Sequence, residues 1–471
     1  MDNYLNRSQP PLLTQMVKTY IDYTNDTSIL DRALPLLIKE HGFWVENRTV
    51  AITSGDRTFH LAHYGVQNTE PRPESYREDY ITANNKSYYA TSGIIYPETH
   101  PLNNSEKAVL YANLASGAES GWDYNSRLLA TPSDAANDVY FPLRSLNTAN
   151  VIGVDLNSIL YANEVAIASY LDQTGNGTLA TEFEQMAKNR SAAMYALMWN
   201  DKYTSYFDYN LTSSSQNIYI PSDSDTTPAQ KADAPEGYQV FFHAAQFYPF
   251  WLGAAPAQLK DNPLAVKLAF RRVSDLLSEK AGAVAATNFL TGQQWDQPNV
   301  WPPLTYALMK GLLQTPATYG SEDPYYVETQ DLSLTLAQRY LDSTFCTWRA
   351  TGGSTDETPQ LEGFRPEDVG IMFEKCAFGL IFFLFSSSNA DNSTNVAGGG
   401  GEYEVVEGFG WTNGVLIWVV DTFANKLQRP DCGNLTAANV DRQKRRDILG
   451  QRAVELSPHD ARWIAKFGQK A

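Results

Sequence analysis

The chain has 471 residues, of which 43% are hydrophobic and 19% are charged, a composition typical of a globular protein with a large core. Its 36 basic and 53 acidic residues give a formal net charge of −17 at neutral pH. A surface this acidic repels phosphate backbones and anionic lipid, so we expect neither nucleic acid nor a membrane as a partner.

Apolar residues recur at helical spacing through most of the chain. The first stripe covers residues 12–21, and Thr27 is placed to cap a second helix over residues 30–38. Further helices are expected over residues 108–115, 156–171, 179–199, 263–277, 303–313, 332–348 and 414–427. No alternation of helices with β-branched strands is found, which disfavours a parallel α/β sheet. Paired helices with long polar loops predict an all-α fold, a toroid of helical hairpins.

Three polar clusters interrupt these helices, at residues 6–11, 72–79 and 119–127. A solvated loop with surface salt bridges is the alternative interpretation of each cluster taken alone. Together they offer Arg, Glu, Asp, Gln and Trp side chains, which is the set needed to grip a polyhydroxylated ligand.

Two unusual segments follow near the C-terminus. Residues 377–385 are apolar without a period, end at three serines and are too short to cross a bilayer. Residues 398–414 contain seven glycines, with Glu402 just after the first run and Trp411 among the aromatic residues behind it. Glycine lets the backbone approach a ligand closely, and linkers lack such aromatic residues, so a binding loop is favoured over a flexible linker. Residues 440–471 form a polar C-terminal tail.

The three cysteines show no metal spacing, and the six histidines are scattered. One cysteine pair is able to bridge, for example Cys346 with Cys432, which would leave Cys376 as a free thiol. Ten Asn-x-Ser/Thr sequons suggest a secreted glycoprotein. The first residues do not form a signal peptide, so a cytoplasmic protein or a chain that lacks its beginning both stay open.

The segment Gln-Trp-Asp-Gln-Pro-Asn-Val-Trp-Pro-Pro at residues 294–303 resembles the tryptophan-rich signature of the trehalases, glycoside hydrolase family 37. Its Asn-Val-Trp-Pro part departs mildly from the commoner Gly-Trp-Ala form. Residues 119–127 resemble the Glu-Ser-Gly-Trp-Asp motif of that family, residues 372–375 its Met-Phe-Glu-Lys motif, and the glycine segment its C-terminal signature. Residues 6–11 and 72–74 also match, in family order across nearly the whole chain.

The resemblance implies an (α/α)6 barrel in which residues 1–471 form a single catalytic domain. It implies a monomer that hydrolyses α,α-trehalose with water to two glucose molecules, with inversion and without a cofactor or metal. Asp123 would be the general acid and Glu374 the general base. An acid must keep its proton near neutral pH, so we expect burial beside Trp122 to raise the pKa of Asp123.

Carried over position by position, the resemblance implies a set of substrate-binding residues: Arg7, Ser8, Gln9, Arg72, Pro73, Glu74, Gly121 and Glu402. The expected pocket lining is Trp122, Trp295, Asp296 and Trp301. For Trp295 and Trp301, packing inside the barrel is an equally open interpretation.

Two departures from the family pattern bear on activity. The first family signature, Pro-Gly-Gly-Arg-Phe, is absent, so the barrel is expected to be incomplete at its N-terminal end. Residues 376–388 stand as an atypical apolar insert directly after Glu374, which a retained untranslated sequence would explain. The alternatives to an active hydrolase are an inactive sugar-binding remnant and a helical scaffold or transferase of the same architecture.

Overall fold

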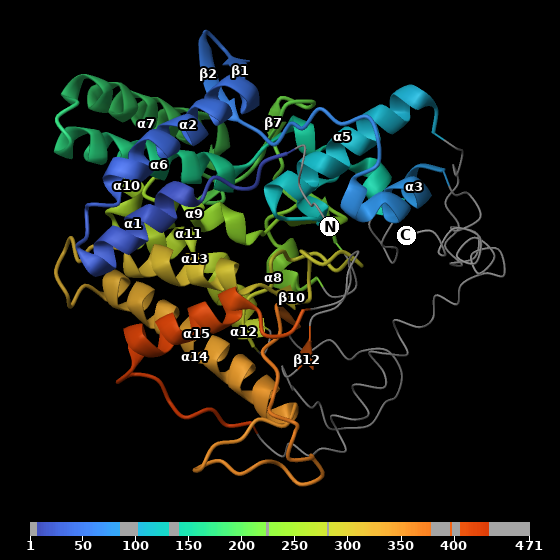
Figure 1. Ribbon diagram of the computed structural model, residues 1–471, viewed down its shortest axis with the longest axis vertical. Coiled ribbons are helices and arrows are strands. Elements are labelled where there is room, and N and C mark those ends of the chain that lie inside the picture. The colour runs from blue at the N-terminus through green and yellow to red at the C-terminus, as the bar shows by residue number, and fades with distance from the viewer. Residues whose placement is uncertain are drawn as a thin grey trace.

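The computed structural model describes residues 7–84, 102–130, 141–222, 226–279, 282–377, 396–397 and 406–432. The apolar segment from residue 378 to 388, the glycine run with Glu402, and the tail 440–471 lie outside the described residues. Long helices dominate the described part of the chain (Figure 1). They are α1 (Leu13–Thr24), α2 (Leu30–Arg48), α3 (Tyr76–Asn84), α5 (Asn104–Ser120), α6 (Val154–Gln173), α7 (Gly177–Met198), α11 (Pro263–Ala269), α12 (Arg271–Glu279), α13 (Pro302–Leu313), α14 (Pro324–Ala350) and α15 (Gly410–Phe423).

Short elements fill the connections between these helices. Three are single α-helical turns, α8 (Pro228–Lys231), α9 (Tyr248–Trp251) and α10 (Ala257–Lys260). The 3₁₀ turns are η1 (Pro73–Ser75), η2 (Ser126–Leu128), η4 (Phe141–Ser145), η5 (Thr148–Asn150) and η6 (Ala244–Phe247). The short strands are β3 (Val151–Ile152), β4 (Trp199–Asn200), β5 (Ser205–Tyr206), β6 (Tyr209–Asn210), β7 (Ser215–Gln216), β8 (Tyr219–Pro221), β9 (Tyr238–Val240), β10 (Asn299–Val300), β11 (Cys376–Ala377) and β12 (Val396–Ala397).

The helices pack in antiparallel pairs, as the sequence predicts. Helices α6 and α7 form one pair, α13 and α14 another, and α15 contacts both members of the second pair. Helices α1 and α2 pack on α6, so that these elements lie side by side on the left of Figure 1. Helices α3 and α5 contact each other on the right of that view.

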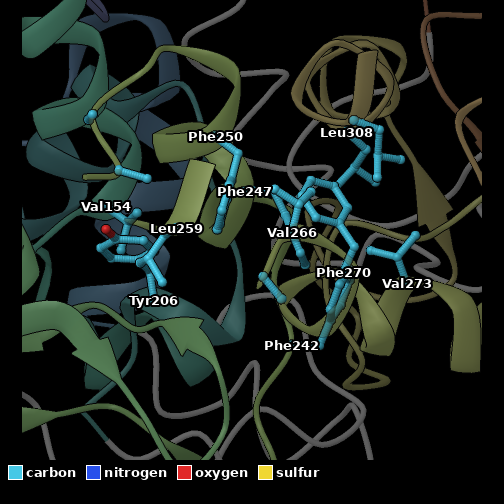
Figure 2. Close-up of a cluster of buried hydrophobic side chains, with 14 of the residues drawn as sticks. Val154, Tyr206, Phe242, Phe247, Phe250, Leu259, Val266, Phe270, Val273 and Leu308 are labelled. Atoms are coloured by element: carbon cyan, nitrogen blue, oxygen red, sulfur yellow. The ribbon is translucent and has the colours of Figure 1, made fainter. Parts of the chain in front are cut away.

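The largest cluster of buried apolar residues lies between these pairs (Figure 2). Phe242, Phe247, Phe250 and Phe270 meet in it, with the Phe247 and Phe270 ring centroids 4.4 Å apart. Phe270 also divides the helix predicted over residues 263–277 into α11 and α12. Phe270 is fully buried, and burying a phenylalanine ring is worth about 2–3 kcal/mol.

A β-hairpin that the sequence analysis did not predict joins α2 to the rest of the chain. Strands β1 (Thr49–Ser54) and β2 (Arg57–Ala62) pair in antiparallel register from Thr49 opposite Ala62 to Ser54 opposite Arg57. The two-residue turn begins at Gly55, whose φ of +58° suits glycine. Only a few of its side chains are buried, so the hydrophobic alternation that reveals a strand is weak.

A disulfide joins Cys346 on α14 to Cys432, and Cys376 is a buried free cysteine. The pairing suggested from the sequence is therefore confirmed. Within the described residues, every helix is too short or too polar to cross a membrane.

Candidate active site

The segment that precedes α1 docks on the C-terminal end of α5. The Ser8 N–H donates to Glu119 Oε1 over 3.0 Å, and Gln9 Nε2 donates to the Ala118 carbonyl over 3.1 Å. Helix α5 is followed by its C-cap Gly121, whose φ of +72° is strained for residues with a side chain. A Cβ at Gly121 would also meet Pro10 at 3.4 Å. The structure thus brings the first and third polar clusters together.

Two arginines of the predicted substrate site are paired with carboxylates. Arg7 forms an ion pair with Glu74, which joins the first cluster to the second. Arg72 binds Asp79 in a two-pronged arrangement, with Nε at 3.0 Å and Nη2 at 2.7 Å from the carboxylate oxygens. The Arg72 guanidinium also lies over the Tyr124 ring, 5.3 Å from its centroid. Pro73 begins the turn η1 between these two pairs.

Asp123 follows the C-terminal end of α5, and the charges of Arg72 and Arg7 act on its carboxyl group. Burial raises the pKa of its carboxyl from 3.8 to about 6, because a low-dielectric environment disfavours the charged form. Arg72, Arg7 and Lys375 each oppose this rise in the pKa. The expected raised pKa of Asp123 is therefore found, with burial as its main cause.

Gln294 connects the Asp123 loop to the Glu374 loop. Its Nε2 donates to the main-chain carbonyl of Asp123, and its Oε1 accepts a hydrogen bond of 2.9 Å from Lys375 Nζ. Trp301 Nε1 holds the main-chain carbonyl of Gln294 at 2.9 Å. The Lys375 ammonium lies over the same Trp301 ring, 5.0 Å from its centroid.

Glu374 is buried and its backbone is fixed by the start of α15. The Glu374 N–H donates to the Val406 carbonyl over 2.9 Å, and Trp411 Nε1 donates to the Glu374 carbonyl over 2.8 Å. Thr412 Oγ1 holds the preceding carbonyl, that of Phe373, at 2.7 Å. Burial raises the pKa of Glu374, and Lys375 opposes the rise. Its Oε2 has no hydrogen-bond partner among the described residues.

Three tryptophans stack beneath the Asp123 loop. The Trp295 and Trp301 rings are parallel with centroids 3.7 Å apart, and Trp122 stacks on Trp295 at 5.3 Å. All three side chains are buried among apolar residues. This burial is what the packing interpretation of Trp295 and Trp301 expects, and their part in lining a pocket stays a prediction.

Asp296 joins neighbouring segments by hydrogen bonds beside the three stacked tryptophans. Its carboxylate accepts hydrogen bonds from the Ser126 N–H and from the hydroxyls of Ser126, Thr287 and Thr291, each 2.7 Å long. Burial raises the pKa of Asp296 to about 6, and these donors oppose the rise. The carboxylate thus joins the Asp123 loop to the tryptophan-rich segment.

Sequence reasoning missed a buried ion cluster around Arg127. Its guanidinium donates to both oxygens of Asp155, over 2.9 and 2.7 Å, and also to Asp208. It lies over the Trp122 ring, 5.0 Å from the centroid. At Gly153 a Cβ would meet Asp155 Oδ1 at 2.6 Å, so only glycine leaves room for this carboxylate. Asp155 and Asp208 stand in no motif, so nothing in the sequence indicated them.

Among the described residues, the site therefore combines two carboxyl groups with a shared lysine and two carboxylate-paired arginines. Arg7, Ser8, Gln9, Arg72, Pro73, Glu74, Gly121, Asp123 and Glu374 all belong to segments that meet here. Asp123 has a raised pKa, and Glu374 is held beside a cation. Such a pair can donate a proton to a leaving group and take one from water. The position of Glu402 lies outside the described residues.

Comparison with known proteins gives matches over most of the chain. The family model described as Trehalase matches residues 2–424. A trehalase of Dictyostelium discoideum is 32% identical over 91% of this chain and 60% of its own length. A trehalase of Oryctolagus cuniculus is 31% identical over 90% of this chain and 58% of its own length. The chain thus spans about 60% of the length of these curated relatives.

Among solved structures, the neutral trehalase Nth1 of Saccharomyces cerevisiae matches with a TM-score of 0.52 and 19% sequence identity. The match covers 89% of this chain and 63% of that protein. This likeness concerns the fold, and it confirms the expected all-α (α/α)6 barrel architecture.

Proposed function

Because the chain belongs to the trehalase family, we propose that it hydrolyses α,α-trehalose with water to two glucose molecules. The observation that carries the proposal is the connection of Asp123 to the Glu374 loop through Gln294 and Lys375. It joins a carboxyl group of raised pKa to a buried carboxylate from a distant segment.

In the proposed reaction Asp123 is the general acid and Glu374 the general base. The Asp123 carboxyl gives its proton to the glycosidic oxygen, which is a poor leaving group as an alkoxide. Glu374 takes a proton from a water molecule, which attacks the anomeric carbon from the opposite face as the glycosidic bond breaks. One glucose leaves with inverted configuration and the other keeps its own. This geometry requires the two carboxyl groups to lie about 6.5–9.5 Å apart.

The remaining residues of the resemblance are proposed to hold the sugar rings. Arg7 and Glu74, linked as an ion pair, offer donors and acceptors to hydroxyl groups, and Arg72 adds a third charged group beside Asp123. Ser8, Gln9, Pro73, Gly121 and Glu402 complete the proposed set. The Ser8 main-chain N–H and the Gln9 side-chain amide also bond to α5, which helps to fix the position of the neighbouring Arg7.

We also infer that the enzyme is a monomer that works outside the cytosol. The Cys346–Cys432 disulfide is of the kind that persists in oxidising compartments. The sequon residues Asn25, Asn47 and Asn176 are exposed, as glycan attachment requires.

The decisive experiment measures glucose release from trehalose by the chain and by Asp123→Asn and Glu374→Gln variants. We expect each variant to lose about 10²- to 10⁴-fold in kcat, the range that a general acid or base contributes. Glu184→Gln is the matched control, since Glu184 is exposed on α7 and should leave the rate unchanged. Initial products should be α- and β-glucose in equal amounts, as seen by NMR, if the reaction inverts.

A parent chain that releases no glucose would contradict the proposed activity. If that chain still gained thermal stability from trehalose, it would instead behave as the inactive sugar-binding remnant. Full activity in either carboxylate variant would remove the role assigned to that residue.

A further inference from the structure

Lys375 is a fully buried lysine directly after the proposed base. Its Nζ donates to Gln294 Oε1 over 2.9 Å and lies over the Trp301 ring at 5.0 Å. Taking an ammonium group out of water is costly, so buried lysines are rare unless a partner compensates. The nearby carboxyl groups of Glu374 and Asp123 both favour its charged form.

The hydrogen bonds through Lys375 join three segments that are far apart in sequence. Gln294, on the tryptophan-rich segment, reaches the Asp123 carbonyl with its amide and Lys375 with its amide oxygen. Trp301 contacts both ends of this link, by a hydrogen bond to the Gln294 carbonyl and through its ring face to the ammonium group. A change in the position of Lys375 is therefore transmitted to the loop that carries Asp123.

We propose that Lys375 is a positioning residue, which ties the Asp123 loop to the Glu374 loop through Gln294 and acts with its charge on both carboxyl groups. The expected effect of Lys375 on kcat rests on the proposed function. The expected effect of its charge on the pKa values of Asp123 and Glu374 does not depend on that function.

Other charges around these carboxyl groups are already matched. Asp123 faces Arg7 and Arg72 besides Lys375, and those arginines are paired with Glu74 and Asp79.

Glu374 faces Lys375, whose partner Gln294 is neutral. Burial lowers the pKa of Lys375 to about 8, so the lysine stays charged at acidic and neutral pH.

The test compares Lys375→Met with Lys310→Met and with the parent. Lys310 is a matched control, because it is half-buried on α13 and its Nζ lies over the Trp418 ring at 5.7 Å, away from the site. Methionine removes the charge, and its unbranched side chain fills a space similar to that of lysine; circular dichroism checks that each variant is folded. Lys375→Gln provides a second neutral variant, which is polar.

Loss of the Lys375 charge should shift both limbs of the pH profile of kcat/KM to higher pH by about one unit. The acidic limb reports ionisation of Glu374 and the alkaline limb that of Asp123. We expect kcat to fall about 10- to 100-fold, since a shift of about 1 Å costs that much. Gln294→Leu removes the side-chain hydrogen bonds between the Asp123 and Glu374 loops but keeps the Lys375 charge. It should therefore lower kcat while shifting the two limbs of the pH profile less than Lys375→Met does.

A second readout needs no turnover. Carbodiimide couples an amine to protonated carboxyl groups, so peptide mass spectrometry of labelled Asp123 against pH gives its titration midpoint. This midpoint should rise by about one unit in Lys375→Met and stay unchanged in Lys310→Met.

An unchanged midpoint together with unchanged limbs would overturn the inference. A parent that releases no glucose, but whose midpoint moves in Lys375→Met, would sustain the electrostatic role while the proposed function fails.

Discussion

Buried charged side chains in this molecule are of two kinds. Most are matched by an opposite charge, whereas the burial of Asp123 is only partly offset by the cations around it. Glu119 is fully buried but accepts two hydrogen bonds from Arg48, at 2.9 and 2.8 Å. Arg127 is matched by Asp155 and Asp208. Asp123 has cations around it that do not fully offset its burial, so the pKa of its carboxyl stays above the ordinary value. A buried charge in a matched pair serves the framework, whereas the Asp123 carboxyl binds its proton more tightly than an ordinary aspartate does.

Asp123 should therefore reduce stability at neutral pH. Its pKa is 3.8 when unfolded and about 6 when folded, so the folded state binds more protons between these values. The stabilisation from this group is complete below about pH 4 and is lost as pH rises through about 6. We expect Asp123→Asn to gain up to about 3 kcal/mol in free energy of unfolding over the parent at pH 7, and little at pH 4.

Urea unfolding of both proteins at the two pH values measures this difference. Glu184→Gln provides the comparison for an exposed carboxylate and should show no such pH dependence. An equal gain for Asp123→Asn at pH 4 and pH 7 would contradict the raised pKa.

At this scale the sequence predicted Asp123 and Glu374 as the reacting groups, which stays a prediction, and it gave no sign of the residues that change their pKa values. Asp123 and Glu374 lie in motifs that resemble a known family. Lys375 lies in the same motif, yet a lysine beside a glutamate usually indicates a solvated surface. Its burial depends on Gln294 and Trp301, which are distant in sequence, so no local pattern could reveal it.

Helix α5 is the element that delivers Asp123 to the site, and its first turn is capped. Asn103 Oδ1 accepts from the N–H groups of Ser105 and Glu106, each over 3.0 Å, and Glu106 Oε2 accepts from the Asn103 N–H over 2.8 Å. This capping box satisfies donors that a helix start leaves unpaired.

We expect Asn103→Ala to lower the free energy of unfolding by about 1 kcal/mol, because the cap is lost. Asn103→Asp is the matched control, since it also removes the sequon but keeps an acceptor at the cap. Chemical unfolding followed by circular dichroism measures both variants. An equal loss in Asn103→Asp would show that the cap is not the cause.

Predicted helices agree with the structure where an apolar stripe covers the whole element. Residues 156–171 and 303–313 were predicted, and α6 and α13 extend only slightly further. Helix α5 was predicted over residues 108–115 and is longer at both ends. Its final turn is rich in small and polar residues, which are buried only because other segments, including the one at Ser8, pack on them.

For the molecule as a whole, the disulfide ties the end of the described chain to α14. Cys346 and Cys432 are 86 residues apart, and Gln338 on the same helix exchanges hydrogen bonds of 3.0 and 2.7 Å with Gln428. Closing a loop of this length restricts the unfolded chain and is worth about 4 kcal/mol.

Reductant should therefore lower the Tm of the parent, as measured by scanning fluorimetry. The double variant Cys346→Ser, Cys432→Ser should start at the lower Tm and not respond further. Cys376→Ser, which removes the free cysteine, is the control and should keep the response to reductant. A parent Tm that reductant does not change would contradict a stabilising role for this bond.

The distant contacts of the site also determine when it can form during synthesis. Asp123 meets Gln294 across 171 residues, and the loop of Glu374 is fixed by Trp411 and Thr412, which emerge later still from the ribosome. Contacts of such long range form late, after local helices. A nascent chain that has not reached α15 therefore lacks the contacts that fix the Glu374 loop, and the two carboxyl groups of the proposed reaction are set in place only after that helix has been synthesised.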